Sequence, residues 1–220
     1  MAQFQNVPMN CDAMAPYYSV LEHLSFGSSL EKSRCVFLGE AATSLSAIVC
    51  GGGDGRFLAR LLQASSYLNV DFVDMSPKMV ELAERRVLGM GQSFRKRVKF
   101  HTCDIRNFWA RPGSYDLIVT HFFLDCFSET ELPSVVSRIA NWGRPNGLWI
   151  MSEFREAQGP VSRVWTHAVI RFLYAAFRFM TGLRVTRLPN YVAALEGAGY
   201  SLFSEKKILG GLLHSSLWKI

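Results

Sequence analysis

The sequence lacks the cysteine and histidine patterns of disulfide-rich and metal-binding proteins. Its five cysteines are odd in number and scattered, and no two form a Cys-x-x-Cys pair, so we expect neither a disulfide framework nor a zinc site. The five histidines show no metal-ligand spacing either, and we expect no metal. The residues are Cys11, Cys35, Cys50, Cys103, Cys126, His23, His101, His121, His167 and His214.

We expect neither a secretory leader nor a membrane span. Residues 1–9 contain no basic region followed by a long apolar run, so no signal peptide is expected. Charges interrupt the aromatic segment 160–183 too often for a membrane span, which needs about 20 mostly apolar residues. Together with the cysteine usage, this predicts a cytoplasmic protein, with peripheral membrane contact left open.

The composition indicates one folded domain. Hydrophobic residues make up 49% of the 220 positions and charged residues 19%, which excludes a disordered chain. The net charge of +6 permits an acidic substrate, an anionic membrane surface or a nucleic acid, and does not choose among them. The densest basic run, Arg95-Lys96-Arg97 with Lys99, is interpreted as a solvated loop.

Apolar runs alternate with helical segments through most of the chain, which predicts a doubly wound α/β fold. Its sheet is expected to be mostly parallel, with seven strands and helices on both faces. Two last runs joined by Gly210-Gly211 predict a C-terminal antiparallel hairpin. A leading helical region is expected over 13–32, ending near Gly27 and the serines after it. The expected strands are 45–50, 68–73, 98–102, 117–120, 148–152, 201–208 and 212–219; the expected helices are 56–63, 77–88 and 129–141.

The first strand stops at the glycine-rich sequence Gly51-Gly52-Gly53-Asp54-Gly55. Glycines at this spacing let a backbone approach a ligand that a Cβ atom would block. Dinucleotide-binding enzymes need a glycine at the sixth position, where this chain has Arg56, and the P-loop needs a following Gly-Lys-Ser/Thr. Both classes are therefore excluded, and a tight turn alone remains an alternative to a binding loop.

Two acidic residues extend this pattern to a nucleoside site. Asp74 ends the second strand, where a carboxylate can accept hydrogen bonds from both ribose hydroxyls, and Met75 beside it can pack on an adenine face. Asp104 follows the third strand and can accept from an adenine amino group. Each acid alone is more often a solvated residue or a helix cap, but the three elements together predict a binding site at the carboxyl edge of the sheet.

The order Gly-x-Gly-x-Gly, Asp-Met-Ser-Pro-x-Met, Cys-Asp-Ile and Tyr-Asp-Leu-Ile-Val resembles class I S-adenosylmethionine-dependent methyltransferases over about residues 46–153. The resemblance implies S-adenosylmethionine as cofactor and S-adenosylhomocysteine as product. The flanking segments resemble the menaquinone and ubiquinone C-methyltransferase branch; they are residues 12–18, preceded by Cys11 in place of an aromatic residue, and residues 187–214. The implied cofactor-binding residues are Tyr17, Gly51, Gly53, Gly55, Asp74, Met75, Asp104, Ile105, His121 and Phe122.

One position departs from the family. Members usually have an acid two residues before the first loop glycine, where it helps hold the methionine part of the cofactor, and this chain has Val49. The cofactor ammonium group must then be held by other groups. Loop carbonyls, His121 and Asp54 are the candidates.

The catalytic candidates follow the fourth strand. His121 is the first choice as a base or positioning group, because an ordinary histidine pKa lies near neutrality. Asp125 is the second, and it can instead cap the next helix. Glu153, Tyr17 and Tyr18 are further candidates, with plain packing as the alternative. The sequence Thr120-His121-Phe122-Phe123 lacks the Asn/Asp-Pro-Pro-aromatic motif of enzymes that methylate nucleic-acid amino groups, so nucleic acid is not an expected substrate.

Residues 1–220 are expected to form a single methyltransferase domain, with an N-terminal helical cap at 1–44 and a helical lid insertion at 155–188. The helix expected at 160–183 has a basic stripe and a broad apolar surface, which fits a lid over a small apolar or aromatic acceptor or a helix lying on a membrane surface. The alternatives are a methyltransferase acting on protein or RNA and a non-catalytic nucleoside-binding protein. The oligomeric state stays open.

Overall fold

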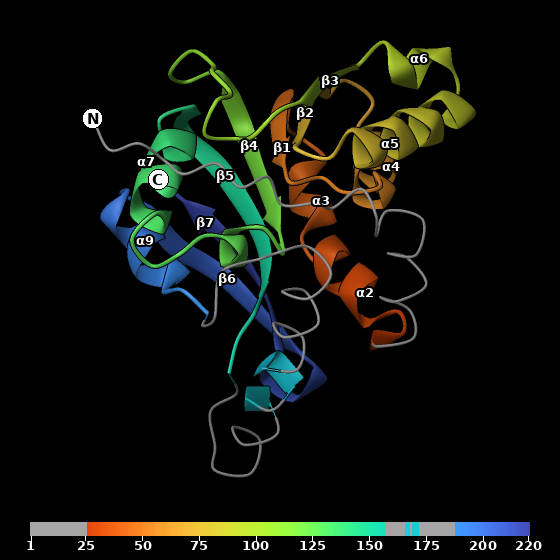
Figure 1. The fold of residues 1–220 in the computed structure, drawn as a ribbon. Helices are drawn as coiled ribbons and strands as arrows, with labels where there is room; N and C mark the ends of the chain where they lie inside the picture. The colour runs from red at the N-terminus through yellow and green to blue at the C-terminus, as the bar shows by residue number, and fades with distance from the viewer. Residues whose placement is uncertain (1–25, 157–165, 168, 172–187) are drawn as a thin grey trace.

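The computed structural model describes residues 26–156, 166–167, 169–171 and 188–220. Its centre is a mixed seven-stranded sheet with the strand order β3-β2-β1-β4-β5-β7-β6 (Figure 1). β1 to β5 pair in parallel, β7 runs antiparallel to both β5 and β6, and β6 forms the edge. The strands are β1 (Ser46–Cys50), β2 (Asn69–Asp74), β3 (Val98–Thr102), β4 (Tyr115–His121), β5 (Gly143–Phe154), β6 (Ser201–Ile208) and β7 (Leu213–Lys219).

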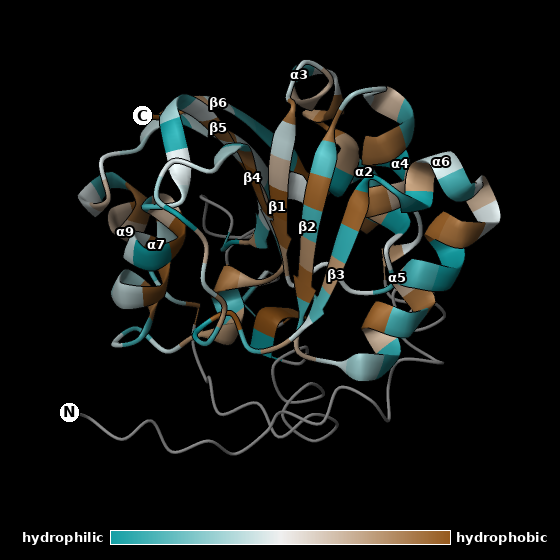
Figure 2. Ribbon diagram, turned by 90° about the horizontal axis from the view of Figure 1, so that it is seen from above, coloured by the Kyte–Doolittle hydropathy of each residue, from teal (hydrophilic) through white to brown (hydrophobic). Residues whose placement is uncertain are grey.

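Helices cover both faces of the sheet. One core cluster joins the sheet to α3, α4 and α5, and a second joins it to α7 and α9. Figure 2 shows hydrophobic residues along β1 and β2, between these two groups of helices. The helical segments are α2 (Ser29–Cys35), α3 (Leu38–Ala41), α4 (Arg56–Ala64), α5 (Pro77–Met90), α6 (Gln92–Arg95), η2 (Leu124–Cys126), α7 (Leu132–Ala140), α9 (Tyr191–Gly197) and η3 (Leu209–Gly211).

The central strands are apolar because helices cover them on both sides. In β1, the side chains of Ala47, Ile48, Val49 and Cys50 are all buried, and they alternate between the two core clusters. Since β1 lies beside β2 on one side and β4 on the other, the loops after these strands meet at the carboxyl edge of the sheet. The fold thus brings the glycine loop, Asp74 and His121 to the same edge.

Several expected boundaries differ from the structure. The serines after Gly27 do not end a helix, because α2 begins at Ser29. β5 begins at Gly143, before the expected start at 148, and its first part is irregular, with Asn146 at φ 62° and a register shift between Tyr115 and Leu117 of β4. The C-terminal hairpin is confirmed, with η3 at its turn.

The basic run is not the solvated loop that the sequence suggested. Arg95 pairs with Glu84 at 2.6 Å and donates to the carbonyl of Val98. Arg97 donates to the carbonyls of Ser65 and Leu62 at 2.6 and 2.9 Å. These two arginines connect the start of β3 to α4 and α5, so part of the positive charge has a structural role.

Candidate active site

The glycine loop has the backbone conformation that its sequence predicts. Gly51, Gly53 and Gly55 have φ values of 64°, 59° and 77°, a region that side chains with a Cβ atom rarely adopt. A Cβ atom on Gly51 would lie 2.3 Å from the ring of Phe123, whereas one on Gly53 would meet nothing within 4 Å. The loop therefore packs tightly at its start and leaves open space at Gly53.

Asp74 is fixed against this loop. Its carboxylate accepts hydrogen bonds from the backbone N–H groups of Gly53 at 2.8 Å and Ser76 at 2.9 Å. Ser76 in turn caps α5 by accepting from the N–H of Met79, with Pro77 in the first turn. The acid at the end of β2 is thus held at the glycine loop, and Met75 lies between it and the cap.

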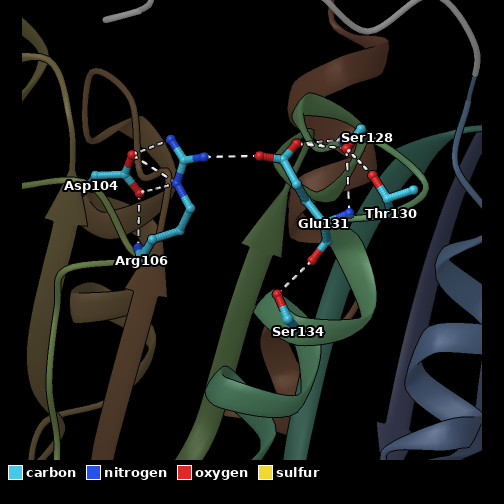
Figure 3. A network of polar contacts seen from close by, with 6 residues as sticks. All are labelled: Asp104, Arg106, Ser128, Thr130, Glu131 and Ser134. Atoms are coloured by element: carbon cyan, nitrogen blue, oxygen red, sulfur yellow. Dashed lines mark hydrogen bonds and ion pairs between the residues drawn. The ribbon is translucent and has the colours of Figure 1, made fainter. Parts of the chain in front are cut away.

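Asp104 belongs to a network that spans two loops (Figure 3). Arg106 donates to both oxygens of Asp104 at 2.6–3.0 Å and to Glu131 at 3.0 Å. Burial alone raises the pKa of Asp104, but the hydrogen bonds from Arg106 outweigh it and hold the pKa below its ordinary value. Glu131 and Ser128 bond each other reciprocally before α7, as in a capping box. The network joins the loop after β3 to the start of α7.

Val49 stands where related enzymes have an acid, and its side chain lies in the core and not at the site. Val49 is buried in the core cluster of α4 and α5. Asp54, one candidate to replace it, pairs with Arg56 at 2.9 Å and with Arg86 at 3.4 Å. Because two arginines already neutralise Asp54, His121 and the loop carbonyls remain the better candidates for holding an ammonium group.

His121 ends β4 in an apolar position. Its side chain is buried, its ring packs edge-on against Phe57 at 4.4 Å, and neither ring nitrogen has a hydrogen-bond partner among the described residues. Burial, and then the charge of Arg34, lowers its pKa well below the ordinary value. The expectation of a near-neutral pKa is therefore wrong, because burial removes the ring from solvent and disfavours its charged form. A neutral imidazole offers one N–H donor and one lone pair.

Two acids lie close to the end of β5. Glu153 is fully buried, and its Oε1 accepts from the N–H groups of Phe123 and Leu124 at 3.1 and 2.9 Å. Burial, and then the charge of Asp125, raises the pKa of Glu153 well above its ordinary value. Asp125 lies in η2, while the start of α7 is capped by Ser128 and Glu131.

An aromatic cluster lies beside His121. The ring of Phe122 is 5.0 Å from that of Phe154, which is 5.7 Å from that of Phe26. Phe122 has φ 52°, an unusual value for a residue with a side chain, and the guanidinium of Arg34 lies 5.2 Å from its ring. Ile170 belongs to the same apolar group, so part of the expected lid segment packs there.

Eight of the ten expected cofactor-binding residues lie at or next to this edge. Ile105 is buried in the core cluster below it, beside Phe108. Tyr17 and Tyr18 lie outside the described residues, as do most of the expected cap and lid. Sequence reasoning missed Arg106 and Tyr191; the spacing Ser128-x-x-Glu131 was the available sign of the cap at α7.

Two expected absences concern only the described part of the chain. There, no group of three or more histidines, cysteines or acids is placed to hold a metal ion. Within the same residues, no helix is long and apolar enough to cross a membrane.

The profile of a methyltransferase domain family matches residues 48–149. Curated relatives include an N-terminal Xaa-Pro-Lys N-methyltransferase 1-B of Xenopus laevis, 27% identical over 68% of this chain and 66% of the relative. The corresponding Bos taurus enzyme is 25% identical over 85% of this chain and 83% of the relative.

Among solved structures, an O-methyltransferase family protein of Burkholderia thailandensis matches with a TM-score of 0.66 and 20% identity, over 94% of this chain and 57% of that protein. A 1,6-didemethyltoxoflavin-N1-methyltransferase of the same organism, solved with its substrate and S-adenosylhomocysteine, matches with a TM-score of 0.65 and 17% identity, over 94% of this chain and 84% of that protein. The likeness shows a common methyltransferase fold.

The match to a methyltransferase domain profile and the methyltransferase relatives together define the chain as an enzyme. The expected donor, S-adenosylmethionine, agrees with the matched methyltransferase domain and with the S-adenosylhomocysteine bound in the second of these solved structures. The site fits this donor, because the glycine loop leaves open space at Gly53, and Asp74 lies at the same edge of the sheet as His121, whose ring has no hydrogen-bond partner in the described part of the chain.

Proposed function

We propose that the enzyme transfers a methyl group from S-adenosylmethionine to a small acceptor with an apolar or aromatic body. The observation that carries this proposal is His121, a buried, neutral ring without a partner among the described residues, beside the aromatic side chains of Phe122 and Phe154. Apolar walls with one or two oriented polar groups are typical of small-molecule sites. The resemblance to quinone C-methyltransferases supports the same acceptor class.

In this proposal the site works by binding and orientation. Asp74 and the glycine loop hold the adenosine part, with Asp104 and Ile105 at the adenine. The donor supplies an electrophilic methyl group, which an acceptor atom displaces in line. His121 orients the acceptor through a hydrogen bond, or takes its proton where the acceptor must lose one. Its low pKa makes it a weak base, which favours acceptors that need little help with deprotonation.

A protein amine is the second candidate acceptor. The curated relatives methylate protein N-termini according to their names, and the acid Asp125, next to the buried Glu153, offers a carboxylate for an ammonium group. Binding of a peptide acceptor would depend less on the positive charge of the enzyme than binding of a nucleic acid would.

Methyl-transfer assays with labelled donor separate these acceptors. The panel contains quinols, phenols and heteroaromatic amines in one arm and peptides beginning Xaa-Pro-Lys in the other. We expect transfer in the first arm only, and loss of that transfer in His121→Phe. Transfer to the peptides alone would overturn the small-acceptor proposal, and failure to bind S-adenosylmethionine in calorimetry would overturn the whole site assignment.

A further inference from the structure

Glu153 occupies an unusual position for a carboxyl group. It is the residue before the last of β5, its side chain is fully buried, and Oε2 has no hydrogen-bond partner among the described residues. Oε1 accepts two backbone N–H groups at the start of η2, from Phe123 and Leu124. Such bonds satisfy helix N–H groups that otherwise lack partners.

Among the residues that the structure describes, no positive charge acts on Glu153. Asp125 faces it from η2, and the hydroxyl of Tyr191 faces it from α9. The nearest cation along the chain, Arg155, pairs with Glu205 at 3.2 Å, and His214 of β7 bonds the same carboxylate at 2.7 Å. An ionised carboxylate at full burial needs a paired cation, and these cations are committed to Glu205.

The loop that Glu153 holds also shapes the cofactor site. Phe123, whose N–H bonds Glu153, packs its ring directly on Gly51, where a Cβ atom would approach the ring to 2.3 Å. Gly51 is the first residue of the glycine loop and bonds the carbonyl of Val73 at the end of β2. A shift of η2 would therefore move Phe123 and release the start of the loop.

We propose that Glu153 is a positioning residue that works in its protonated, neutral form: its Oε1 fixes η2 and Phe123, and through them the glycine loop that binds S-adenosylmethionine. The proposal assigns Glu153 no proton transfer and no counter-charge for an acceptor. It rests on the binding of S-adenosylmethionine and not on the acceptor proposed above, so the two fail separately.

The first test compares Glu153→Gln with Glu153→Leu by calorimetry with S-adenosylmethionine. Glutamine keeps an oxygen for the two N–H groups and carries no charge, so its affinity for the donor should stay close to that of the unsubstituted protein. Leucine removes the acceptor, and the affinity should fall about tenfold or more, as expected when two buried donors lose their partner. A large loss of affinity in Glu153→Gln would overturn the proposal.

The second test follows the melting temperature from about pH 5 to pH 8. A carboxyl group whose pKa is raised by folding contributes stability that is full below the pKa of the unfolded chain, near 4.3, and is lost as the pH rises through the folded value. Glu153→Gln cannot lose a proton, so it should become progressively more stable than the unsubstituted protein as the pH rises.

Glu196→Gln, at an exposed position in α9, is the matched control. The difference in melting temperature between this variant and the unsubstituted protein should not grow with pH. A Glu153→Gln variant that instead becomes less stable with rising pH would mean an ionised Glu153 and overturn the proposal. Loss of transfer to a peptide amine in Glu153→Gln, with donor affinity intact, would assign Glu153 a counter-charge role and overturn it as well. Both readouts apply even if Glu153→Leu fails to fold.

Discussion

The two halves of the active site use the same residue types in opposite ways. In the half proposed to bind the adenosine, Asp74 accepts two backbone N–H groups and Asp104 is paired with Arg106. In the half proposed to bind the acceptor, both nitrogens of His121 and one oxygen of Glu153 are buried without a partner among the described residues. The carboxylates of the first half are hydrogen-bonded within the protein, whereas the second half is apolar and has buried polar atoms without hydrogen-bond partners among the described residues.

This difference teaches which groups remain charged. Asp104 keeps a lowered pKa because Arg106 compensates its burial, whereas the pKa of Glu153 rises because burial and Asp125 act on it without a cation. An unmet buried hydrogen bond costs about 1–3 kcal/mol, so a ligand that supplies it gains that amount in binding. The adenosine half is thus built for affinity and the acceptor half for selectivity.

The largest effect is expected in the glycine loop, from a substitution at Gly55 compared with the same substitution at Gly53. Gly55→Ala places a Cβ atom 2.6 Å from the Cβ and 2.7 Å from the Cα of Ala83 in α5, at φ 77°. We expect a loss of about 3 kcal/mol in unfolding free energy, from overpacking and strain together. Urea unfolding monitored by circular dichroism measures it.

Gly53→Ala is the matched control, since it has a similar φ of 59° and nothing within 4 Å. It carries the backbone strain alone, about 1 kcal/mol. Equal losses in the two variants would show that close packing on α5 does not contribute at Gly55.

The second effect tests the acceptor half. His121→Phe keeps a ring against Phe57 but removes both nitrogens, so we expect the rate of methyl transfer to fall about 100-fold with little change in donor affinity. The pKa of His121 also lies well below 6.5, so the ring stays neutral and gives no loss of activity between about pH 7 and pH 6.

Steady-state assays over this pH range on both forms of the enzyme check the prediction. A fall in activity near pH 6.5 that disappears in His121→Phe would contradict the neutral ring. Unchanged transfer in His121→Phe would leave His121 as packing alone.

The sequence predicted the adenosine half better than the acceptor half. The glycine spacing and Asp74 depend on local chain geometry at strand ends, so their pattern was visible without a structure. The states of His121 and Glu153 depend on burial in the folded chain and on charges brought close by folding, Arg34 for His121 and Asp125 for Glu153, which no local pattern reveals. Arg95 and Arg97 were misread for the same reason, because their partners lie in other elements.

The third effect concerns Asp74. Asp74→Ala removes the acceptor of two N–H groups and the carboxylate proposed to bind the ribose, so donor affinity should fall about tenfold to 100-fold. Asp74→Asn keeps one acceptor oxygen, so its donor affinity should lie between those of Asp74→Ala and the unsubstituted protein. Calorimetry with S-adenosylmethionine measures both, and equal affinity in all three proteins would remove Asp74 from the cofactor site.

The smallest effect is expected at Arg106. Arg106→Gln removes the paired cation of Asp104, whose stabilisation is present above the pKa of the unfolded chain and lost as the pH falls through the lower folded value. At pH 7 we expect a loss of about 1 kcal/mol in stability and a few-fold loss in donor affinity, since both side chains are partly exposed.

Arg85→Gln is the matched control, because Arg85 forms an exposed pair with Glu81 on α5, for which about 0.3–0.5 kcal/mol is expected. The gap between the two variants should narrow as the pH falls below the ordinary pKa of a carboxyl group, because Asp104 and Glu131 then take up protons and Arg106 loses its charged partners. A gap that stays open in acid would mean that Arg106 acts through packing between the β3 and α7 loops rather than through its charge, and the contrast between a paired adenosine half and an unpaired acceptor half would then lose its electrostatic basis.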